Sequence, residues 1–438
     1  MSPFDRSIVH LKILFVTDAY KPQASGPVYS VEMLSHALVR MGHKVYIAGP
    51  GKSLKSKVYE HRGNLKVYGI SSVRAPIYPD LWIPVPGLVS LELEKIVEVI
   101  KPDIIHVQDH FLLGSAALAL AKKKSLPVVG TNHFMPENFL HYIPMPGKLK
   151  EQIIKIAWKQ FAHQYNQLSY VTAPTQIAVD VIKKVGLKNN IEAISNGIDL
   201  SRFTPKNKGG YLKEKYRIPN KKILLFVGRI DPEKRLDMVV RAFMKAREKM
   251  DLHLVIAGKG GYQRDLTAIV EELGAKPYVT MTGFVADSDL PKLYRVADAF
   301  VMASDAELQS IATMEAMASG LPIIAARAVA LPLLVKNNVN GYLFRANDEK
   351  ELVDSILKMF TSEKRRVAMG RQSLRIIKAH DVMKSARKMV KIYKEALVAP
   401  AEIKAAPGGV MSKVRKSKGF EKLKEQLGPY RGEDKENF

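Results

Sequence analysis

The chain has 438 residues, of which 47% are hydrophobic and 25% charged, and it carries a formal net charge of +25. This length exceeds one typical hydrophobic core, so we expect two domains. No apolar run approaches the roughly 20 residues that cross a bilayer. The lack of cysteine excludes disulfides and cysteine metal sites, and favours a cytoplasmic protein. The positive charge indicates an acidic partner (nucleic acid, anionic lipid or a phosphorylated substrate), unless the whole proteome is basic.

In the first half of the chain, short buried strands alternate with helical patterns. Strands are predicted at 13–16, 45–48, 65–70, 104–107, 128–131, 170–173 and 191–194, and helices at 31–41, 91–100 and 111–121. A loop at 19–30 separates the first strand from the first helix. Strands joined by helical crossovers predict a doubly wound parallel sheet, whose ligand loops lie at the carboxyl ends of the strands.

The pattern restarts after the sequence Asn-Gly-Ile-Asp at 196–199 and a polar linker at 205–220. Strands are predicted at 223–227, 252–257, 279–282, 299–303 and 323–325, and helices at 236–250 and 263–273. The predicted fold class is α/β, with two tandem Rossmann-like domains at 1–200 and 201–380 and a ligand cleft between them. A helix at 381–398 is expected to pack back toward the N-terminal domain. The tail at 399–438, rich in Pro, Gly and charge, is expected to be disordered.

The segment 304–326, SDAELQSIATMEAMASGLPIIAA, joins a buried strand to a polar loop and a helix. Glu307 is expected in the loop, and Glu315 in a helix that begins after the N-cap Ser310 and ends near Gly320. The free N–H groups at the helix start suit a phosphate. We therefore predict a nucleotide-sugar here, with Glu307 on the sugar and Glu315 on the ribose. For either glutamate alone, an ordinary amphipathic helix is the alternative.

Three further turns follow strands of the second unit. Arg229 and Lys234 are suited to clamp a diphosphate opposite Glu307, the arginine as a fork and the lysine as a point charge. The alternative for this turn is a surface ion-pair loop. Gly258 would let the backbone approach a nucleotide. The turn with Phe284 and Val285 could hold a base edge by backbone contacts, and core packing of Phe284 is its alternative.

Together, Arg229 with Lys234, the turn 283–285, and Glu307 with Glu315 inside EAMASGLPII resemble the donor site of family-four retaining glycosyltransferases. The similarity covers roughly 11–397, with the hinge at 196–199. The resemblance implies the two-Rossmann GT-B fold, a UDP-sugar or GDP-sugar donor, retention of anomeric configuration, and no metal or other cofactor. It also assigns Gln309, Ser310 and Ile311 to the donor site.

The resemblance has one match and two departures that bear on the site. His133 corresponds to the histidine that contacts the transferred sugar in the family. The family uses a Gly-rich loop near the diphosphate, whereas this chain has only Gly26, followed by Pro27. Leu308 stands where a glycine is usual, and the sequence Glu-Leu-Gln-Ser at 307–310 is more similar to members that glycosylate lipids.

The acceptor is expected to bind the first domain. The segment 134–143 resembles diacylglycerol glucosyltransferases, in which an acidic residue precedes a His-Tyr pair. The candidate residues for the acceptor or the membrane are Glu137, His141, Asp109, Lys148, Lys155 and Lys159. The three lysines form a cationic face of a helix at 148–163, beside tryptophan and isoleucine, which suits an anionic membrane surface. A domain helix with a solvated lysine face is the alternative.

These observations predict a peripheral membrane glycosyltransferase at the inner face of the membrane. It would move a hexose, with glucose from UDP-glucose as the first choice, to a diacylglycerol-type lipid and form an α-linked glycolipid. The alternatives are a phosphoinositol, polyprenyl-linked or soluble sugar acceptor, or a non-catalytic protein that binds sugar-nucleotides or nucleic acid. The lysines and arginines at 413–424 in the basic tail suit an anionic membrane, and contact with nucleic acid or mere solvation of the charges are the alternatives. Aromatic residues are sparse in the tail, which weakens the nucleic-acid alternative, so no nucleic-acid partner is expected.

Overall fold

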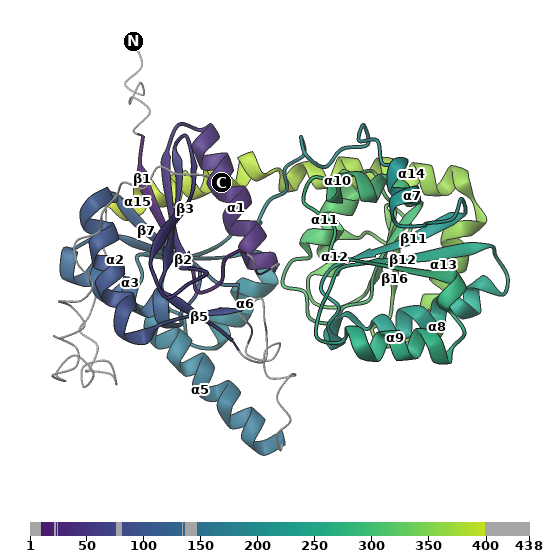
Figure 1. The fold of residues 1–438 in the computed structure, drawn as a ribbon, viewed down its shortest axis with the longest axis horizontal. Helices are drawn as coiled ribbons and strands as arrows, with labels where there is room; N and C mark the ends of the chain where they lie inside the picture. Colours follow the sequence, from purple (N-terminus) through teal and green to yellow (C-terminus); the bar gives the residue numbers. More distant parts are fainter. Residues whose placement is uncertain are drawn as a thin grey trace, which may run out of the picture.

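The N-terminal domain is built on an eight-stranded sheet in the order β10-β9-β8-β7-β1-β2-β4-β3 (Figure 1). The computed structural model describes residues 10–21, 23, 25–75, 81–133, 135 and 147–398. The strands are β1 (Lys12–Val16), β2 (Lys44–Pro50), β3 (Lys57–Arg62), β4 (Leu65–Ile70), β7 (Ile104–Val107), β8 (Val128–Thr131), β9 (Tyr170–Ala173) and β10 (Ile191–Ala193). All neighbours pair in parallel except β3, which runs antiparallel to β4.

Helices cover both faces of this sheet, which explains why its central strands are fully buried and mostly apolar. They are α1 (Gly26–Arg40), α2 (Pro86–Ile100), α3 (Leu112–Lys124), α5 (Gly147–Tyr165) and α6 (Gln176–Lys184). A small hairpin of β5 (Ser72–Arg74) and β6 (Trp82–Pro84) lies apart from the sheet. The prediction of a loop over 19–30 is wrong for its second part, because α1 already begins at Gly26. Pro27 lies in its first turn, where a missing N–H costs no hydrogen bond.

The second domain has a six-stranded, wholly parallel sheet in the order β13-β12-β11-β14-β15-β16. Its strands are β11 (Lys222–Val227), β12 (Leu252–Ala257), β13 (Val279–Gly283), β14 (Ala299–Met302), β15 (Ile323–Ala326) and β16 (Gly341–Phe344). The helices are α7 (Tyr211–Lys215), α8 (Leu236–Arg247), α9 (Gln263–Glu272), α10 (Leu290–Leu293), α11 (Ile311–Ala318), α12 (Leu331–Leu334), α13 (Glu349–Thr361) and α14 (Glu363–Ile377). The predicted α/β fold with two Rossmann-like domains is confirmed.

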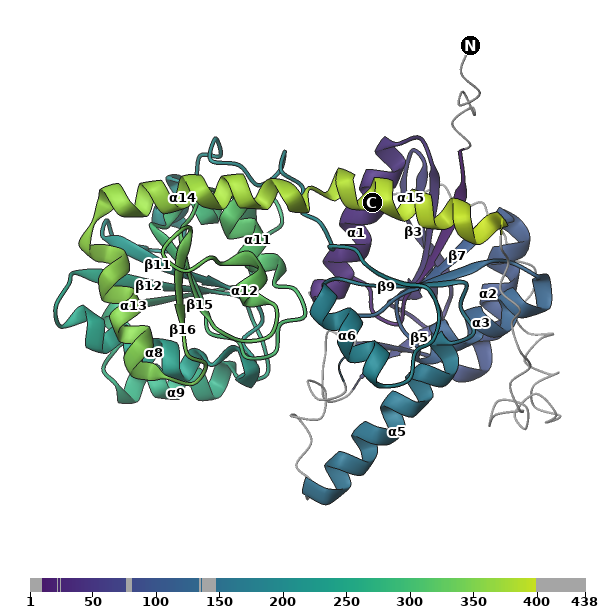
Figure 2. The same cartoon turned by 180° about the vertical axis from the view of Figure 1, so that it is seen from behind.

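The last described helix, α15 (Val382–Val398), begins at the hinge and runs along the N-terminal domain. Figure 2 shows α14 and α15 following one another along one side of the molecule. The apolar face of α15 joins the core of the N-terminal domain through residues such as Met389 and Tyr393. The Tyr393 hydroxyl also lies 2.7 Å from Nδ1 of the buried His106. The C-terminal helix therefore belongs structurally to the N-terminal domain, and residues 399–438, expected to be disordered, lie outside the described part.

The hinge sequence at 196–199 is held by contacts from both sides. Ile198 pairs with Asp381 in an isolated parallel bridge just before α15. On the N-terminal side, the Asn196 amide oxygen accepts a hydrogen bond from the Ser30 hydroxyl at 3.0 Å. Gly197 has a positive φ of 77°, and a Cβ there would lie 2.6 Å from the Val382 Cα. The hinge therefore requires glycine at this close approach.

Candidate donor and acceptor sites

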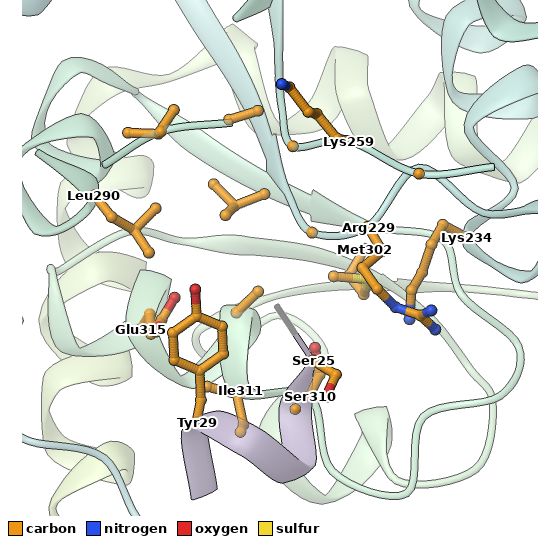
Figure 3. Close-up of a pocket in the computed structure, with 18 of the residues that line it drawn as sticks. Ser25, Tyr29, Arg229, Lys234, Lys259, Leu290, Met302, Ser310, Ile311 and Glu315 are labelled. Atoms are coloured by element: carbon orange, nitrogen blue, oxygen red, sulfur yellow. The ribbon is translucent and has the colours of Figure 1, made fainter. Parts of the chain in front are cut away.

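A cavity of about 730 Å³ lies between the two domains. Its wall contains all the residues predicted for donor binding together with Glu307; they are Gly26, Arg229, Lys234, Gly258, Phe284, Val285, Gln309, Ser310, Ile311 and Glu315. In Figure 3, Arg229 and Lys234 lie on one side of the cavity, and Glu315 lies on the other with Tyr29. The arrangement therefore suits an elongated ligand with a charged end.

The charged end is formed by short ion pairs within the C-terminal domain. Lys234 contacts the Glu307 carboxylate directly, and both side chains are mostly buried. Burial raises the pKa of Glu307, but the Lys234 ammonium more than offsets this, so the pKa lies below its ordinary value. Arg229 lies 2.9 Å from Asp231 and 3.4 Å from Glu233. Glu307 was expected opposite the two cations, whereas the structure shows it beside Lys234.

Helix α11 connects the two ends of the cavity. The Ser310 side chain accepts a hydrogen bond from the Thr313 N–H at 3.4 Å, as its predicted N-cap position requires. The next residue, Ile311, contributes to the cavity wall. The first turn of α11 thus offers backbone N–H groups to an anion between Lys234 and Glu315.

Glu315 is buried at the opposite end of the cavity. The Tyr294 hydroxyl donates a hydrogen bond to its carboxylate at 2.7 Å. Burial raises the pKa of Glu315 to about 7, because the charged form has lost water and the tyrosine bond only partly compensates. A ribose hydroxyl would supply one more hydrogen bond to this carboxylate and would favour its ionised form.

Two turns of the C-terminal domain complete the wall. Gly258 has a φ of 145°, and a Cβ there would lie 1.8 Å from the Gly228 carbonyl oxygen. This close approach explains the glycine. Phe284 is 55% exposed and lines the cavity, so its packing in the core, the alternative interpretation, is wrong. Together with Val285 it gives the cavity wall an apolar surface that suits a nucleobase.

His133 follows β8 in the N-terminal domain and is not among the residues that line the cavity. Its Nε2 lies 3.0 Å from the Gln108 amide oxygen. Burial lowers the pKa of His133 to about 4, so the imidazole is neutral near pH 7. A neutral imidazole held by a glutamine can position a hydroxyl by a hydrogen bond, but it has no positive charge with which to stabilise a leaving group.

Asp109 connects two loops of the N-terminal domain and does not line the cavity. Its carboxylate accepts hydrogen bonds from the Thr17 hydroxyl at 2.9 Å and the Asp18 N–H at 3.0 Å. Asp18 in turn accepts from the Leu113 and Gly114 N–H groups at the start of α3. Burial and the neighbouring Asp109 raise the pKa of Asp18 to about 7. The two carboxylates therefore join the loops after β1 and β7. These contacts give Asp109 a structural role. Its predicted contact with the acceptor stays a prediction.

Helix α5 divides into a packed half and an exposed half. Trp158, Phe161 and Tyr165 are buried toward its C-terminal end. Its N-terminal end, where Leu149 is 47% exposed, projects from the domain in Figures 1 and 2, and Ile156 at the middle of the helix is 65% exposed. The predicted lysines Lys148, Lys155 and Lys159 are all exposed. Exposed lysines are expected for both interpretations of this helix, and Ile154 still packs against the core of the N-terminal domain, so the membrane contact stays a prediction. Glu137 and His141 lie outside the described residues.

Several cavity residues were not predicted from the sequence, and Tyr29 is the largest of them; the others include Gln23, Ser25, Lys259 and Gln263. The signal for Tyr29 is its position two residues after Pro27, which marks the first turn of a helix after a strand. In the part of the chain that the structure describes, three or more His, Asp or Glu residues gather nowhere in a metal-binding arrangement. None of the described helices has the length and apolarity to cross a membrane.

Comparisons with known proteins agree with this geometry. A family model described as "Glycosyltransferase Family 4" matches residues 24–202, and one described as "Glycosyl transferases group 1" matches residues 211–375. The chain is 31% identical over 355 residues to alpha-monoglucosyldiacylglycerol synthase of Streptococcus pneumoniae, and the matched region covers 80% of this chain and 78% of the relative. A GDP-mannose-dependent alpha-mannosyltransferase of Corynebacterium glutamicum is 26% identical over 365 residues, 82% of this chain and 83% of the relative.

The fold likewise resembles that of solved structures. The Anabaena protein Alr3699/HepE, in complex with UDP and glucose, superposes with a TM-score of 0.70 at 17% identity, covering 88% of this chain and 100% of the other. Two Rossmann-like domains around an interdomain cavity define the class of GT-B glycosyltransferases. Within that class, the chain belongs to glycosyltransferase family 4.

Proposed function

We propose that this glycosyltransferase moves glucose from UDP-glucose to a diacylglycerol-type membrane lipid with retention of configuration, forming an α-linked glycolipid. The observation that carries the proposal is the cavity itself, with Lys234 and Glu307 at one end and Glu315 at the other. A sugar-diphosphate would lie near Lys234 and a nucleoside near Glu315. The name of the pneumococcal relative, alpha-monoglucosyldiacylglycerol synthase, supports the choice of sugar and acceptor.

The proposed chemistry relies on charge and position. As the bond between sugar and diphosphate breaks, negative charge develops on the leaving group. Arg229, Lys234 and the N–H groups of α11 stabilise that charge. Both cations are already paired with carboxylates, but a guanidinium has five N–H donors and an ammonium three, so donors remain for phosphate oxygens. These cations supply the positive charge that a metal would otherwise provide, so we propose that no metal is needed.

Sugar and acceptor must also be held in one geometry. Glu307 is oriented by Lys234 and accepts hydroxyl hydrogen bonds from the sugar. His133 follows β8 outside the cavity wall, and its proposed role of reaching the sugar ring from the N-terminal domain rests on the family resemblance. The leaving diphosphate accepts the proton of the attacking hydroxyl on the same face of the sugar, which retains the configuration. The acceptor lipid is presented by a membrane surface at the exposed half of α5, whose lysines favour anionic headgroups.

The proposal is tested with purified protein, radiolabelled UDP-glucose, UDP-galactose or GDP-mannose, and vesicles that contain an anionic phospholipid with or without diacylglycerol. We expect label in the lipid phase only with UDP-glucose and diacylglycerol, and an α anomeric proton coupling in the product. The GDP-mannose arm is included because a mannosyltransferase is among the relatives. Transfer from that donor would contradict the proposed sugar. Transfer independent of lipid would contradict the acceptor, and no turnover of any donor would contradict the activity.

A further inference from the structure

Tyr29 is an aromatic residue of the N-terminal domain that lies in the donor cavity. It belongs to the first turn of α1, and its ring packs against the hydrophobic core of the C-terminal domain. In Figure 3 the ring stands beside Ile311 and Glu315, with its hydroxyl end turned toward the inside of the cavity. The cavity wall at this end therefore comes from both domains.

The surroundings of Tyr29 are polar as well as apolar. Burial, followed by the nearby Asp287 and Glu315 carboxylates, raises the pKa of Tyr29 well above its ordinary value. The side chain is therefore a neutral phenol at every physiological pH. It offers a flat apolar ring and one hydroxyl group, next to carboxylates that accept hydrogen bonds. This combination suits a ribose, which has an apolar face of C–H groups and two neighbouring hydroxyls.

Lys21 links α1 to the loop that follows β13. Lys21 lies 2.7 Å from Glu32 of α1 and 3.9 Å from Asp287 of that loop. The Arg202 guanidinium donates to the Asp287 carbonyl oxygen at 2.8 Å. The loop also carries Val285, which lines the cavity. These contacts outside the cavity bring α1, with Tyr29, close to the loop that follows β13.

We propose that Tyr29 contacts the nucleoside half of the donor and closes the N-terminal side of the cavity over the ribose. The step rests on the proposed function, which locates the diphosphate at Arg229 and Lys234. A nucleoside attached to that diphosphate extends along α11 toward Glu315 and meets the Tyr29 ring. Tyr29 is therefore a specificity-determining residue for nucleoside diphosphates against ligands that carry only the phosphates.

The test compares Tyr29→Ala with Met33→Ala by calorimetric titration of UDP, UDP-glucose and inorganic pyrophosphate. Met33 is the matched control, because it lies one turn further along α1 and also packs against the C-terminal core, but does not line the cavity. We expect Tyr29→Ala to weaken UDP and UDP-glucose binding about tenfold and to leave pyrophosphate binding unchanged. Met33→Ala should bind all three ligands as the unaltered protein does.

A second substitution, Tyr29→Leu, keeps apolar volume at the domain contact and covers the case in which Tyr29→Ala does not fold. It should show the same selective loss. Unchanged UDP affinity in the Tyr29 variants, an equal loss in Met33→Ala, or an equal loss for pyrophosphate would overturn the inference and leave the proposed function standing. If the unaltered protein binds none of the nucleotides, the proposed function fails and this inference fails with it.

Discussion

Lys234 and Glu307 decide together what charge a ligand meets at one end of the cavity. Each is mostly buried, and each is the direct ionic partner of the other. Removing one member of such a pair leaves the other charge desolvated and uncompensated, which costs far more than losing a solvent-exposed pair. The two residues therefore have to be considered as one unit, although 73 positions separate them in the sequence.

We expect Lys234→Ala to lower the affinity for UDP-glucose by about 10- to 100-fold, since one charge-assisted hydrogen bond to a phosphate is lost. The matched control is Lys221→Ala. Lys221 also pairs with a carboxylate, at 2.6 Å from Asp251, but it lies outside the cavity. Calorimetric titration of UDP-glucose into the two variants gives the comparison. If both variants bind alike, the diphosphate does not lie at Lys234.

Glu315 makes the stability of the protein depend on pH. Its pKa in the folded protein is about 7, against 4.5 for the ordinary side chain. Between these values the folded state holds more protons than the unfolded state, so stability falls as the pH rises through this window and levels off above about 7. A shift of this size corresponds to roughly 3 kcal/mol.

Glu315→Gln should therefore be as stable as the unaltered protein near pH 4.5 and more stable by up to roughly 3 kcal/mol at pH 8. Urea unfolding at several pH values measures the difference. Glu272→Gln, which removes an exposed carboxylate at the end of α9, controls for the loss of one negative charge. A stability difference that is independent of pH would contradict the raised pKa of Glu315.

At the level of elements, the buried strands were predictable because both faces of a parallel sheet are covered. Runs such as Ala299–Met302 contain no exposed position and therefore show as continuous apolar sequence. Strand β3 was missed because it is an antiparallel edge strand with charged residues at both of its ends, Lys57 and Arg62. Edge strands need no continuous apolar run.

The candidate site was predictable only where a motif carried it. Glu307, Glu315 and Ser310 lie within one strand-loop-helix segment, so their sequence spacing already indicated a shared site. Tyr29 comes from the other domain. Pro27 marks the start of its helix, but nothing in the sequence indicates that the ring contacts the C-terminal core. The direct contact between Lys234 and Glu307 likewise depends on how two loops of one sheet approach each other, which sequence separation does not reveal.

Helix α5 allows the proposed membrane contact to be separated from chemistry. Ile156 is 65% exposed at the middle of the helix, between the exposed Lys155 and Lys159. Replacing it with aspartate removes apolar area and adds a negative charge, so Ile156→Asp should reduce cosedimentation with anionic vesicles about tenfold. UDP binding should not change. The control is Val99→Asp on α2, where the side chain is 66% exposed. Equal losses for both variants would mean that α5 is not the membrane contact.

At the level of the whole molecule, the donor loop is also part of the contact between the domains. The Leu308 side chain packs against a core cluster of the N-terminal domain, and its carbonyl oxygen accepts a hydrogen bond from the Thr175 hydroxyl at 3.1 Å. The Gln309 side chain lines the cavity, but its amide binds the hinge. It accepts from the Asn196 N–H at 2.8 Å and donates to the Ser195 hydroxyl at 3.0 Å.

Because one short loop serves both purposes, occupancy of the cavity and the relative position of the domains should be coupled. Gln309→Ala removes both hinge hydrogen bonds, each worth about 1 kcal/mol, and leaves the cores of the domains intact. Without ligand, we expect a larger radius of gyration by small-angle scattering. With saturating UDP-glucose, we expect a return toward the original value, since a donor that contacts both domains favours the domain arrangement seen in the structure.

Gln263→Ala, which alters the cavity wall on α9 away from the hinge, is the matched control. If both variants scatter like the unaltered protein, the Gln309 bonds do not hold the domains together. The coupling would then have to come from Leu308 and from the packing of Tyr29.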